Sequence, residues 1–419
     1  MYVRAFSPDD PTVPARTLFS YSTSTDTIGN APVYGKPYTK LTATGDRILF
    51  VEGKGDAIFF VGSNRPDSEG DNMWFLDRYD LKKGKMAQIW TAKAPFVSSV
   101  VKILSAKKGQ VSFVSKRESN KVFPQYCIID SKSGKSEKVR QLTSFENSLP
   151  QLQGVIDRFI TYTRADGVKL SSRLYLPECY DPEKDGRLPL FMWTYPYEYQ
   201  SKAEAEKKRE SRYTFDTPGR TRHMGWATQG YAVLQGFSMP IIAPEVEGQP
   251  NDDFMRQLIM NAEAAIHCLD SLGIVDTGRV AVGGLSYGSF MTTNLMCHTK
   301  LFKAGLAMSG AYNRTLTPFC FQNEERTYWE IEKIYHDMSP FNYADSLSGH
   351  ILFLHGTMDE NTGTHPIQSE RMYFAVIGNG GDADYIQLPY EGHSYIFVEN
   401  LMQMYRETYD MLEKFLKFQ

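Results

Sequence analysis

From about residue 188 to the C-terminus, short apolar runs alternate with longer segments whose apolar residues recur at helical spacing. Leu258, Ala262 and Leu269 lie three to four residues apart or at multiples of that spacing, which predicts a helix over residues 253–272. The apolar runs suit strands buried on both faces of a parallel sheet; they are residues 188–194, 280–282, 304–308, 351–354 and 385–388. This alternation predicts an α/β fold with a mostly parallel, doubly wound sheet.

Before about Leu142 the pattern changes to short alternating strands bounded by turn residues, at residues 57–61, 72–80, 110–116 and 125–130. Two of them run into similar turns, residues 79–85 and 129–135, whose Asp80 and Asp130 are 50 residues apart. That period suggests β-propeller blades, although two matching turns also arise by coincidence in other all-β domains. We therefore divide the chain into a partial β-propeller-like, all-β region, residues 1–145, and an α/β domain, residues 146–419.

The all-β region is short for a propeller. A propeller needs four or more blades of about 40–50 residues, and the region before Leu142 has room for two or three. We therefore expect the chain to be the C-terminal part of a longer protein, whose front would hold further blades and any secretion signal. A partial propeller exposes strand edges, which favours a homo-oligomer, another pairing partner or aggregation.

Ser286 lies between a predicted strand and a helix-like run, and the segment Gly284-Leu285-Ser286-Tyr287-Gly288 fits the G-x-S-x-G nucleophile elbow of α/β-hydrolases. In such a sharp turn the residues two before and two after the serine crowd the backbone, so both need to lack side chains. The pentapeptide alone also arises by chance, but its context makes Ser286 the candidate nucleophile. The backbone N–H of Tyr287 would then be one oxyanion donor.

A serine nucleophile needs a base and an acid that orients it, and in this architecture they follow in the order acid, histidine. The run 351–354 leads into Asp359, at the carboxyl end of a strand where α/β sheets place their chemistry. The run 385–388 leads into a polar loop that ends at His393. Asp359 is therefore our candidate acid, and His393 is our candidate base.

Each of these assignments has competitors. His355 is the nearest rival for the base, but it precedes Asp359 on the same strand end and would face a different way. Glu360 is adjacent to Asp359, so spacing alone leaves it open as the acid. Asp337 and Asp345 lie in the polar stretch before the strand, where a capping or solvated role suits them better.

The second oxyanion donor would come from the loop after the strand over residues 188–194. That loop, Tyr195-Pro196-Tyr197-Glu198-Tyr199, lacks the glycine run that is used when backbone groups do this work. A tyrosine hydroxyl can replace them, and Tyr195 is the best placed. The alternative is that this aromatic loop only packs.

These motifs resemble the prolyl oligopeptidase family of serine peptidases and, within it, most closely the glutamyl endopeptidase branch. The resemblance covers roughly Leu142 to the C-terminus, and its most specific match is SGAYNRTLTPF, residues 309–319. It is also carried by the elbow, by HGTMDEN at residues 355–361 and by EGH at residues 391–393. The resemblance implies a propeller in front of the hydrolase domain, which limits entry to peptides.

By this resemblance, Ser286, Asp359 and His393 correspond to the family's triad, and Tyr195 to the tyrosine whose hydroxyl completes the oxyanion hole. Asn361 resembles the asparagine that dipeptidyl-peptidase members use to bind a substrate carbonyl, where prolyl oligopeptidase itself has arginine. The sequence departs from the glutamyl branch near the site, with leucine at 285 for histidine, tyrosine at 197 for glycine and glycine at 392 for serine.

Cleavage after glutamate would need a cation in the pocket, because a carboxylate buried without a partner is costly and arginine can bind it bidentately. Arg314 and Arg326 are candidates, since both lie between the nucleophile and the acid in sequence; each fits a surface ion pair equally well. Tyr312, with Phe319 and Phe321 nearby, would suit an apolar or proline-accepting pocket. The sequence thus supports a peptidase more firmly than cleavage after glutamate.

Composition narrows the remaining choices. With 419 residues, 42% of them hydrophobic, the chain is long enough for two domains. A net charge of −3 argues against nucleic acid as the main partner. No apolar run approaches the roughly 20 residues that span a bilayer, and residues 1–19 lack a charged-then-apolar leader. Five scattered cysteines without a C-x-x-C pair predict free thiols and no structural metal, and we expect no cofactor.

Three classes of function fit these observations. We favour a serine peptidase, in which His393 takes the proton of Ser286 and an acyl-enzyme forms on peptide substrates. The second possibility is an esterase with the same fold. The propeller-like region before the hydrolase domain and the loop of Tyr195 argue against it. The third is a catalytically silent binding module, which would require that truncation has disabled the site.

Overall fold

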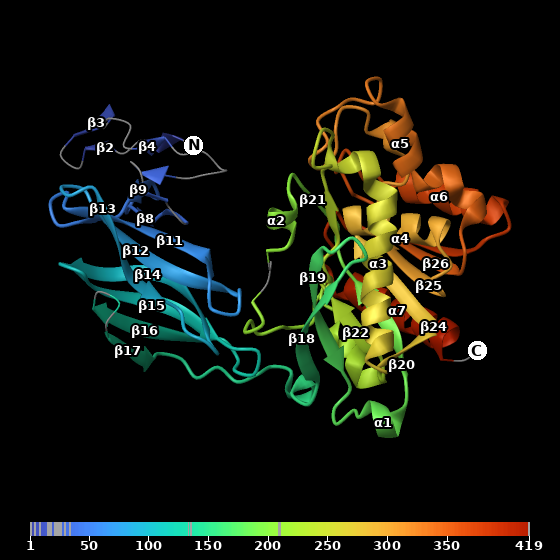
Figure 1. The fold of residues 1–419 in the computed structure, drawn as a ribbon, viewed down its shortest axis with the longest axis horizontal. Coiled ribbons are helices and arrows are strands. Elements are labelled where there is room, and N and C mark those ends of the chain that lie inside the picture. The colour runs from blue at the N-terminus through green and yellow to red at the C-terminus, as the bar shows by residue number, and fades with distance from the viewer. Residues whose placement is uncertain are drawn as a thin grey trace. The chain divides into compact units, whose positions relative to one another are not determined.

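The computed structural model describes residues 35–132, 134, 136–207 and 211–417, and it divides into two compact units (Figure 1). Unit 1 contains residues 1–150 and 208–215, and unit 2 contains residues 151–207 and 216–419. The boundary after residue 145 stays a prediction; it falls between β17 and the 3₁₀ turn at Pro150–Leu152. Ser133 and Lys135 of the second predicted turn, and residues 1–34 of the predicted all-β region, lie outside the described residues.

Unit 1 is built from antiparallel strands, as its alternating pattern predicts. One sheet contains β7 (Lys36–Pro37), β10 (Val51–Glu52), β11 (Ala57–Pro66), β12 (Asn72–Asp80) and β13 (Lys85–Thr91). The second sheet has four strands, β14 (Val97–Lys107), β15 (Gln110–Glu118), β16 (Gln125–Lys132) and β17 (Ser136–Gln141). A separate pair joins β8 (Thr39–Leu41) to β9 (Arg47–Leu49). The two predicted turns connect β12 to β13 and β16 to β17.

The two sheets of unit 1 share one core. Phe59 of β11 and Phe113 of β15, both 0% exposed, belong to the same buried cluster, and the ring of Trp90 meets Phe113 edge-on at 5.0 Å between centroids. The segment 208–215 joins this unit, because Arg212 donates from its backbone N–H and its Nε to the two oxygens of the buried Asp71, at 3.1 and 2.8 Å. No sequence pattern predicts that return.

Unit 2 contains the predicted sheet, which has eight strands in the order β18-β19-β22-β20-β24-β25-β26-β27. Their bounds are β18 (Ile156–Thr163), β19 (Lys169–Leu176), β20 (Leu188–Trp193), β22 (Ala232–Gln235), β24 (Val275–Leu285), β25 (Ala304–Met308), β26 (His350–Gly356) and β27 (Asp382–Leu388). β18 and β19 are antiparallel to their neighbours, and the other strands pair in parallel. A small parallel pair, β21 (Tyr197–Tyr199) and β23 (Pro240–Ile242), lies outside this sheet.

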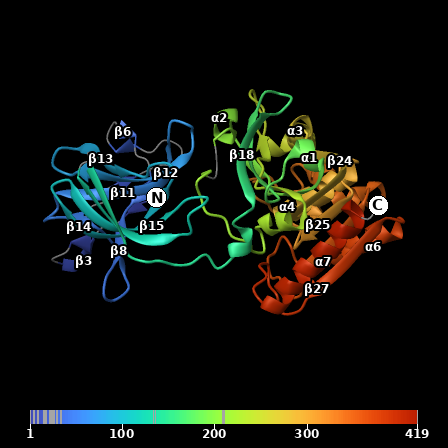
Figure 2. The ribbon, with the colours of Figure 1, turned by 90° about the horizontal axis from the view of Figure 1, so that it is seen from below.

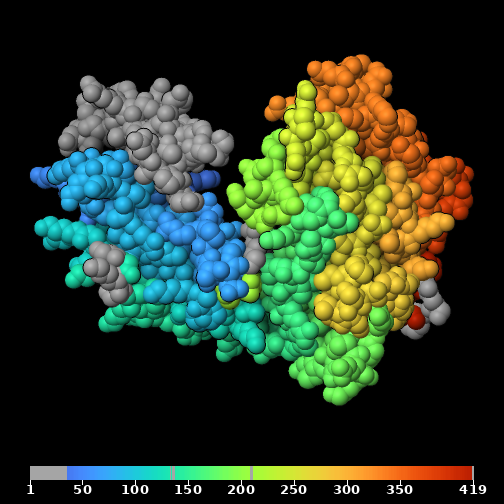
Figure 3. Space-filling view, in the orientation of Figure 1, coloured from blue at the N-terminus to red at the C-terminus, as the bar shows by residue number. Residues whose placement is uncertain are grey.

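The helices described in unit 2 are α1 (Pro182–Asp185), α2 (Lys202–Ala205), α3 (Phe254–Ser271), α4 (Tyr287–His298), α5 (Glu332–Met338), α6 (Ile367–Gly378) and α7 (Val398–Leu416). Four described 3₁₀ segments lie in this unit, at Met224–Gln229, Pro250–Asp253, Arg314–Leu316 and Pro340–Ser346, and a fifth, Pro150–Leu152, crosses the boundary between the units. α3 falls within the helix that the spacing of Leu258, Ala262 and Leu269 predicts, and its outer face forms part of the surface of unit 2 beside β18 and β19 (Figure 3).

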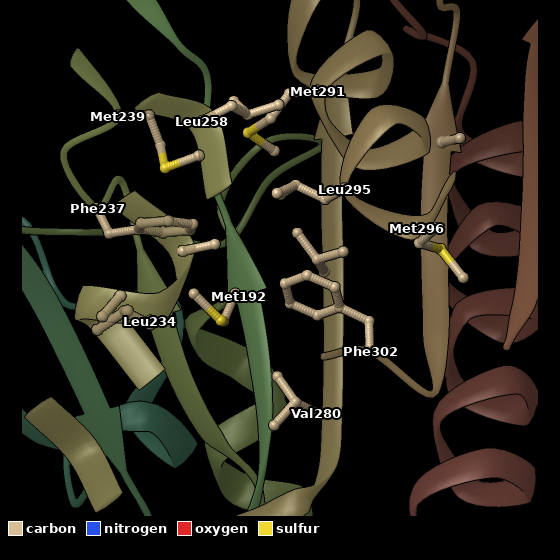
Figure 4. Packing of buried hydrophobic residues seen from close by; sticks show 14 of the residues in the cluster. Met192, Leu234, Phe237, Met239, Leu258, Val280, Met291, Leu295, Met296 and Phe302 are labelled. Atoms are coloured by element: carbon tan, nitrogen blue, oxygen red, sulfur yellow. The ribbon is translucent and has the colours of Figure 1, made fainter. Parts of the chain in front are cut away.

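Alternate residues of each central strand face opposite sides of the sheet, so each strand contributes to two cores. Met192 of β20 packs with Leu258 of α3 and Leu295 of α4 in one buried cluster (Figure 4). The next residue of β20, Trp193, belongs to a second cluster with Leu412 of α7. α3 and α7 accordingly cover opposite faces of the strands (Figure 2). Burial on both faces explains why these strands are apolar throughout rather than alternating.

The chain order reverses across β20 and β24. β22 follows β20 on one side, whereas β24 lies on the other side and the chain then proceeds outward through β25, β26 and β27. Ligands in open α/β sheets bind outside the carboxyl ends of strands at such a switch point. The residues that follow β20 and β24, Tyr195 and Ser286, therefore lie where a site is expected.

No helix in the part of the chain that the structure describes is long and apolar enough to cross a membrane.

We predict that Leu258→Ala destabilises unit 2 by about 2–5 kcal/mol, because Leu258 is 0% exposed and its removal leaves a cavity under α3. Urea unfolding followed by circular dichroism at 222 nm measures this, since the described helices all belong to unit 2. Leu272→Ala is the control: Leu272 follows α3, is 52% exposed and should change stability by no more than about 0.5 kcal/mol. Equal losses in both variants would contradict the assigned core.

Candidate active site

Ser286 lies in the turn between β24 and α4, with φ 61° and ψ −119°. A positive φ is rare outside glycine and stores strain, which persists only where the surroundings hold the residue in place. Here the N–H of Ser286 donates to the carbonyl of Met308 at 2.8 Å, and the carbonyl of Ser286 accepts from the N–H of Phe290 at 3.1 Å. The strand, the turn and the helix thus present the serine as an elbow does.

The two glycines beside Ser286 are required by close backbone contacts. A Cβ at Gly284 would lie 2.3 Å from the carbonyl carbon of Gly288, and a Cβ at Gly288 would lie 2.6 Å from the carbonyl oxygen of Thr194. Neither backbone contact can give way without moving the turn. The glycine spacing read from the sequence therefore has a steric cause in the structure.

Asp359 and His393 meet at the carboxyl ends of β26 and β27. Nδ1 of His393 lies 2.9 Å from Oδ2 of Asp359, and Asp359 is 2% exposed, whereas the side chain of His393 is 27% exposed. Because an ionised carboxylate only accepts, this hydrogen bond requires a proton on Nδ1 of His393, and in the neutral imidazole Nε2 is then the acceptor. This is the tautomer that a general base for a serine needs.

Thr364 is a further partner of this pair. Its Oγ1 lies 3.1 Å from Oδ2 of Asp359 and 2.9 Å from Nδ1 of His393, so the hydroxyl can donate to the carboxylate while it accepts from the imidazole. Oδ1 of Asp359 accepts from the N–H of Asn361 at 3.0 Å. Although burial raises the pKa of Asp359, hydrogen bonds from His355, His393 and the N–H of Asn361 outweigh it and hold that pKa well below its usual value.

The structure separates Asp359 from its sequence rivals. Glu360 and Asp345 are exposed, and Asp337 pairs with Lys333 on the surface. His355 also contacts Asp359: its Nε2 lies 3.1 Å from Oδ2 of Asp359, and its side chain is fully buried. The histidine therefore contacts the same carboxylate as His393, but its other ring nitrogen lies 2.6 Å from Oγ of Ser369, and His355 is not among the described residues that line the pocket of Ser286.

Tyr195 follows β20 and lies beside the elbow. Its ring is 3.7 Å from the position of a Cβ at Gly288 and 5.8 Å, centroid to centroid, from the ring of Tyr287. Burial raises the pKa of Tyr195, against a hydrogen bond with the side chain of Gln322 that lowers it, so the hydroxyl stays protonated as a donor. Tyr195 thus lies next to Tyr287, the residue that follows Ser286.

A pocket of about 410 Å³ opens beside Ser286. Its walls come from the elbow, from the segment after β25 and from the loop after Asp359; they are Ser286, Tyr287, Ala311, Arg314, Leu316, Thr317, Pro318, Phe319, Cys320, Phe321, Gln322, Asn361, Thr362, Gly363 and Thr364. Asn361 lies at this pocket, where its side-chain Oδ1 accepts from the N–H of Gly363 at 3.0 Å. Thr364 connects the pocket to the Asp359–His393 pair.

Arg314 lines this pocket and is 4% exposed. Its guanidinium lies over the rings of Phe290 and Phe321, at 4.1 and 4.2 Å from their centroids. Its buried Nε has no hydrogen-bond partner, and no salt bridge joins Arg314 to any described carboxylate. Burial lowers its pKa, but arginine keeps its charge in proteins. A cation without a salt bridge among the described residues therefore lies at the wall of the pocket, and the carboxyl that acts on its charge is that of the buried Glu198.

Two other residues expected at the pocket lie elsewhere. Arg326 binds Glu324 and Asp252, at 2.8 Å each, so its charge is already paired. Tyr312 is 0% exposed, and its hydroxyl lies 2.8 Å from Oγ of Ser289. Neither side chain is among the described residues that line the pocket. The surface ion pair was the correct alternative for Arg326, and Tyr312 belongs to a buried network.

Sequence reasoning missed Thr364, Glu391 and the contact of His355 with Asp359. Glu391 is fully buried and accepts from the N–H groups of Ile396 and Phe397, at 2.9 and 2.8 Å, which fixes the loop that carries His393. The motif Glu391-Gly392-His393 could have indicated this residue. Thr364 has no distinguishing pattern in the sequence.

Comparison with known proteins gives two family matches. Residues 252–419 match the model described as the prolyl oligopeptidase family, and residues 166–316 match that of the X-Pro dipeptidyl-peptidase (S15) family. The family expected from the motifs is thereby confirmed.

Curated relatives include two named probable glutamyl endopeptidase, chloroplastic. The protein from Oryza sativa subsp. japonica is 37% identical over 418 residues, which cover 98% of this chain and 44% of the relative. The protein from Arabidopsis thaliana is 37% identical over 424 residues, which cover 98% of this chain and 43% of the relative. The chain thus spans less than half the length of these relatives.

Solved structures show the same fold. A putative dipeptidyl aminopeptidase IV from Bacteroides ovatus aligns with a TM-score of 0.67 and 17% identity, over 99% of this chain and 58% of that one. Dipeptidyl peptidase 4 of Porphyromonas gingivalis aligns with a TM-score of 0.64 and 17% identity, over 90% and 56%. The expected fold class, an all-β region before an α/β-hydrolase domain, is confirmed.

We predict that Gly284→Ala destabilises unit 2 by about 1–3 kcal/mol, because its Cβ would collide with the backbone of Gly288. Gly225→Ala is the matched control, since a Cβ at Gly225 meets no atom within 4 Å. Urea unfolding at 222 nm compares the two. A Gly284→Ala variant as stable as Gly225→Ala would show that the backbone of Gly288 does not lie as close to residue 284 as described.

Proposed function

Because residues 252–419 belong to the prolyl oligopeptidase family of serine-type peptidases, we propose that this chain hydrolyses peptide bonds of short peptides through an acyl-enzyme on Ser286, with a preference for glutamate before the cut. The observation that carries the proposal is the pairing of Asp359 with His393, in the required tautomer, beside a strained serine elbow and a pocket.

The reaction begins at Ser286. Nε2 of His393 takes the hydroxyl proton as Oγ attacks the substrate carbonyl, and the resulting oxyanion accepts from the N–H of Tyr287 and the hydroxyl of Tyr195. His393 then gives the proton to the leaving amine, and the peptide C–N bond breaks to leave an ester on Ser286. Water attacks that ester with His393 again as the base, which releases the acid and restores the serine.

Asp359 supports both steps as an anion. Its low pKa means that it remains ionised while His393 carries the transferred proton, so it stabilises the imidazolium without taking the proton itself. Thr364 and the N–H of Asn361 donate to the two oxygens of the carboxylate, which restrains it beside His393.

The preference for glutamate rests on Arg314. A guanidinium that lies over two aromatic rings keeps its orientation, and because it makes no salt bridge with a described carboxylate it can bind one from a substrate bidentately. A glutamate side chain entering this pocket would pair with the cation and offset the cost of burying both charges. The names of the two plant relatives support this assignment.

We predict that Ser286→Ala abolishes both peptide hydrolysis and labelling by a fluorophosphonate, because the alanine has no nucleophilic oxygen. The measurement is mass spectrometry of the labelled chain together with turnover on a peptide library. No adduct at Ser286 in the unchanged chain would overturn the enzyme assignment, and cleavage of esters without cleavage of amides would favour an esterase.

We predict that Arg314→Gln lowers kcat/KM for a substrate with glutamate before the cut, relative to its glutamine counterpart, by about a hundredfold or more, because a buried ion pair loses one partner. The ratio of the two substrates cancels any general loss of folded enzyme. Arg326→Gln is the control and should leave the ratio unchanged, since that arginine already pairs with Glu324 and Asp252. An unchanged ratio in Arg314→Gln would refute the glutamate assignment.

A further inference from the structure

Behind the candidate triad, buried hydroxyl groups lead away from His355 into the core. Nδ1 of His355 lies 2.6 Å from Oγ of Ser369 in α6. Ser369 is also a hydrogen-bond partner of the hydroxyl of Tyr312, and that hydroxyl lies 2.8 Å from Oγ of Ser289 in α4. The side chains form a continuous path from the helix after Ser286 to Asp359.

We infer that this path, Ser289–Tyr312–Ser369–His355, positions the carboxylate of Asp359, so that His355 is a positioning residue for the reaction. The inference rests on the proposed function, because it assigns His355 a role behind the proposed acid. His355 itself touches neither Ser286 nor the pocket among the described contacts.

The direction of the hydrogen bonds follows from the groups at the two ends. The carboxylate of Asp359 only accepts, so His355 donates from Nε2. A neutral His355 then has a lone pair on Nδ1, which takes the proton of Ser369. Tyr312 accepts from the N–H of Gly310 and can also accept from Ser289, which leaves its own proton for Ser369. With Nδ1 of His355 unprotonated and Ser289 as the donor to Tyr312, every donor along the path points toward Asp359.

Because the path is buried, each of its side chains depends on its neighbours in the path for a hydrogen bond. Ser289, Tyr312, Ser369 and His355 are each 0% exposed, so water cannot replace a lost partner. Burial also raises the pKa of Tyr312 to about 12, which keeps its hydroxyl protonated and able to donate. Hydrogen bonds aligned in one direction polarise one another in a medium of low dielectric constant, so the donation at Asp359 is stronger than an isolated imidazole would give.

The path also connects two elements that must keep their relative position. Ser289 lies in the first turn of α4, whose N-terminus follows Ser286, and Ser369 lies in α6, which packs near the loop of Asp359. A fixed path between them holds the acid in register with the elbow. Loss of that register would misplace His393 with respect to Ser286, and small misplacements reduce rates steeply.

The test is the pH dependence of the rate at which a fluorophosphonate labels Ser286, measured on the full chain. In His355→Leu, Asp359 loses one donor, so more negative charge faces His393 and the pKa of that imidazolium rises. We expect the acid limb of the labelling profile to move to higher pH, and the plateau rate to fall roughly tenfold to a hundredfold. His355→Gln keeps an N–H donor at the same distance along the side chain and should restore most of both.

His223→Leu is the matched control. His223 is likewise buried in unit 2, at 1% exposed, but its ring nitrogens have no hydrogen-bond partner, so its loss should leave the acid limb in place. If His355→Leu fails to fold, Ser369→Ala provides the same test, because it removes the donor that fixes the tautomer of His355; it should move the limb in the same direction by a smaller amount.

If the acid limb of His355→Leu or Ser369→Ala stays at the wild-type pH, this inference is overturned. A merely structural role would change the fraction of active chain and leave the pH profile where it is. A limb that moves to lower pH would overturn it as well. If the wild-type chain is not labelled at any pH, the proposed function is refuted instead. Failure of the inference about His355 and failure of the proposed function are therefore distinguishable.

Discussion

The carboxylate of Asp359 is the group on which the site depends. It is almost completely buried, yet it accepts hydrogen bonds from His355, His393, Thr364 and the N–H of Asn361. A buried charge without such partners would be costly and would take up a proton. With them it stays ionised, and it can then hold His393 in one tautomer and stabilise the imidazolium that catalysis forms.

The α/β sheet makes this convergence geometrically simple. Parallel strands bring their carboxyl ends to one edge, so loops that are far apart in sequence meet there. Ser286 follows β24, Asp359 follows β26 and His393 follows β27, while Tyr195 arrives from β20 on the other side of the switch point. Apolar packing on both faces of the sheet fixes these strands, and the chemistry lies in the loops that they carry.

The sequence predicted the central strands and α3 because their patterns are local, and it predicted Ser286, Asp359 and His393 as candidates because each follows a strand. The direction in which a side chain points was harder to predict, because it depends on neighbours that are distant in sequence. Arg314 and Arg326 look alike in sequence, and only the three-dimensional neighbours Glu324 and Asp252 show that Arg326 is the one held in salt bridges. Tyr312 was a candidate pocket residue because Phe319 and Phe321 lie near it in the sequence, but its side chain is buried in the core.

Trapping the intermediate tests the central claim most directly. A glutamyl peptide ester mixed with the full chain, quenched in acid within the first turnover and digested, should yield one acylated fragment, the one that contains Ser286, with the mass of the substrate's acyl group. Product formation without that adduct, or an adduct on any other residue, would contradict the account.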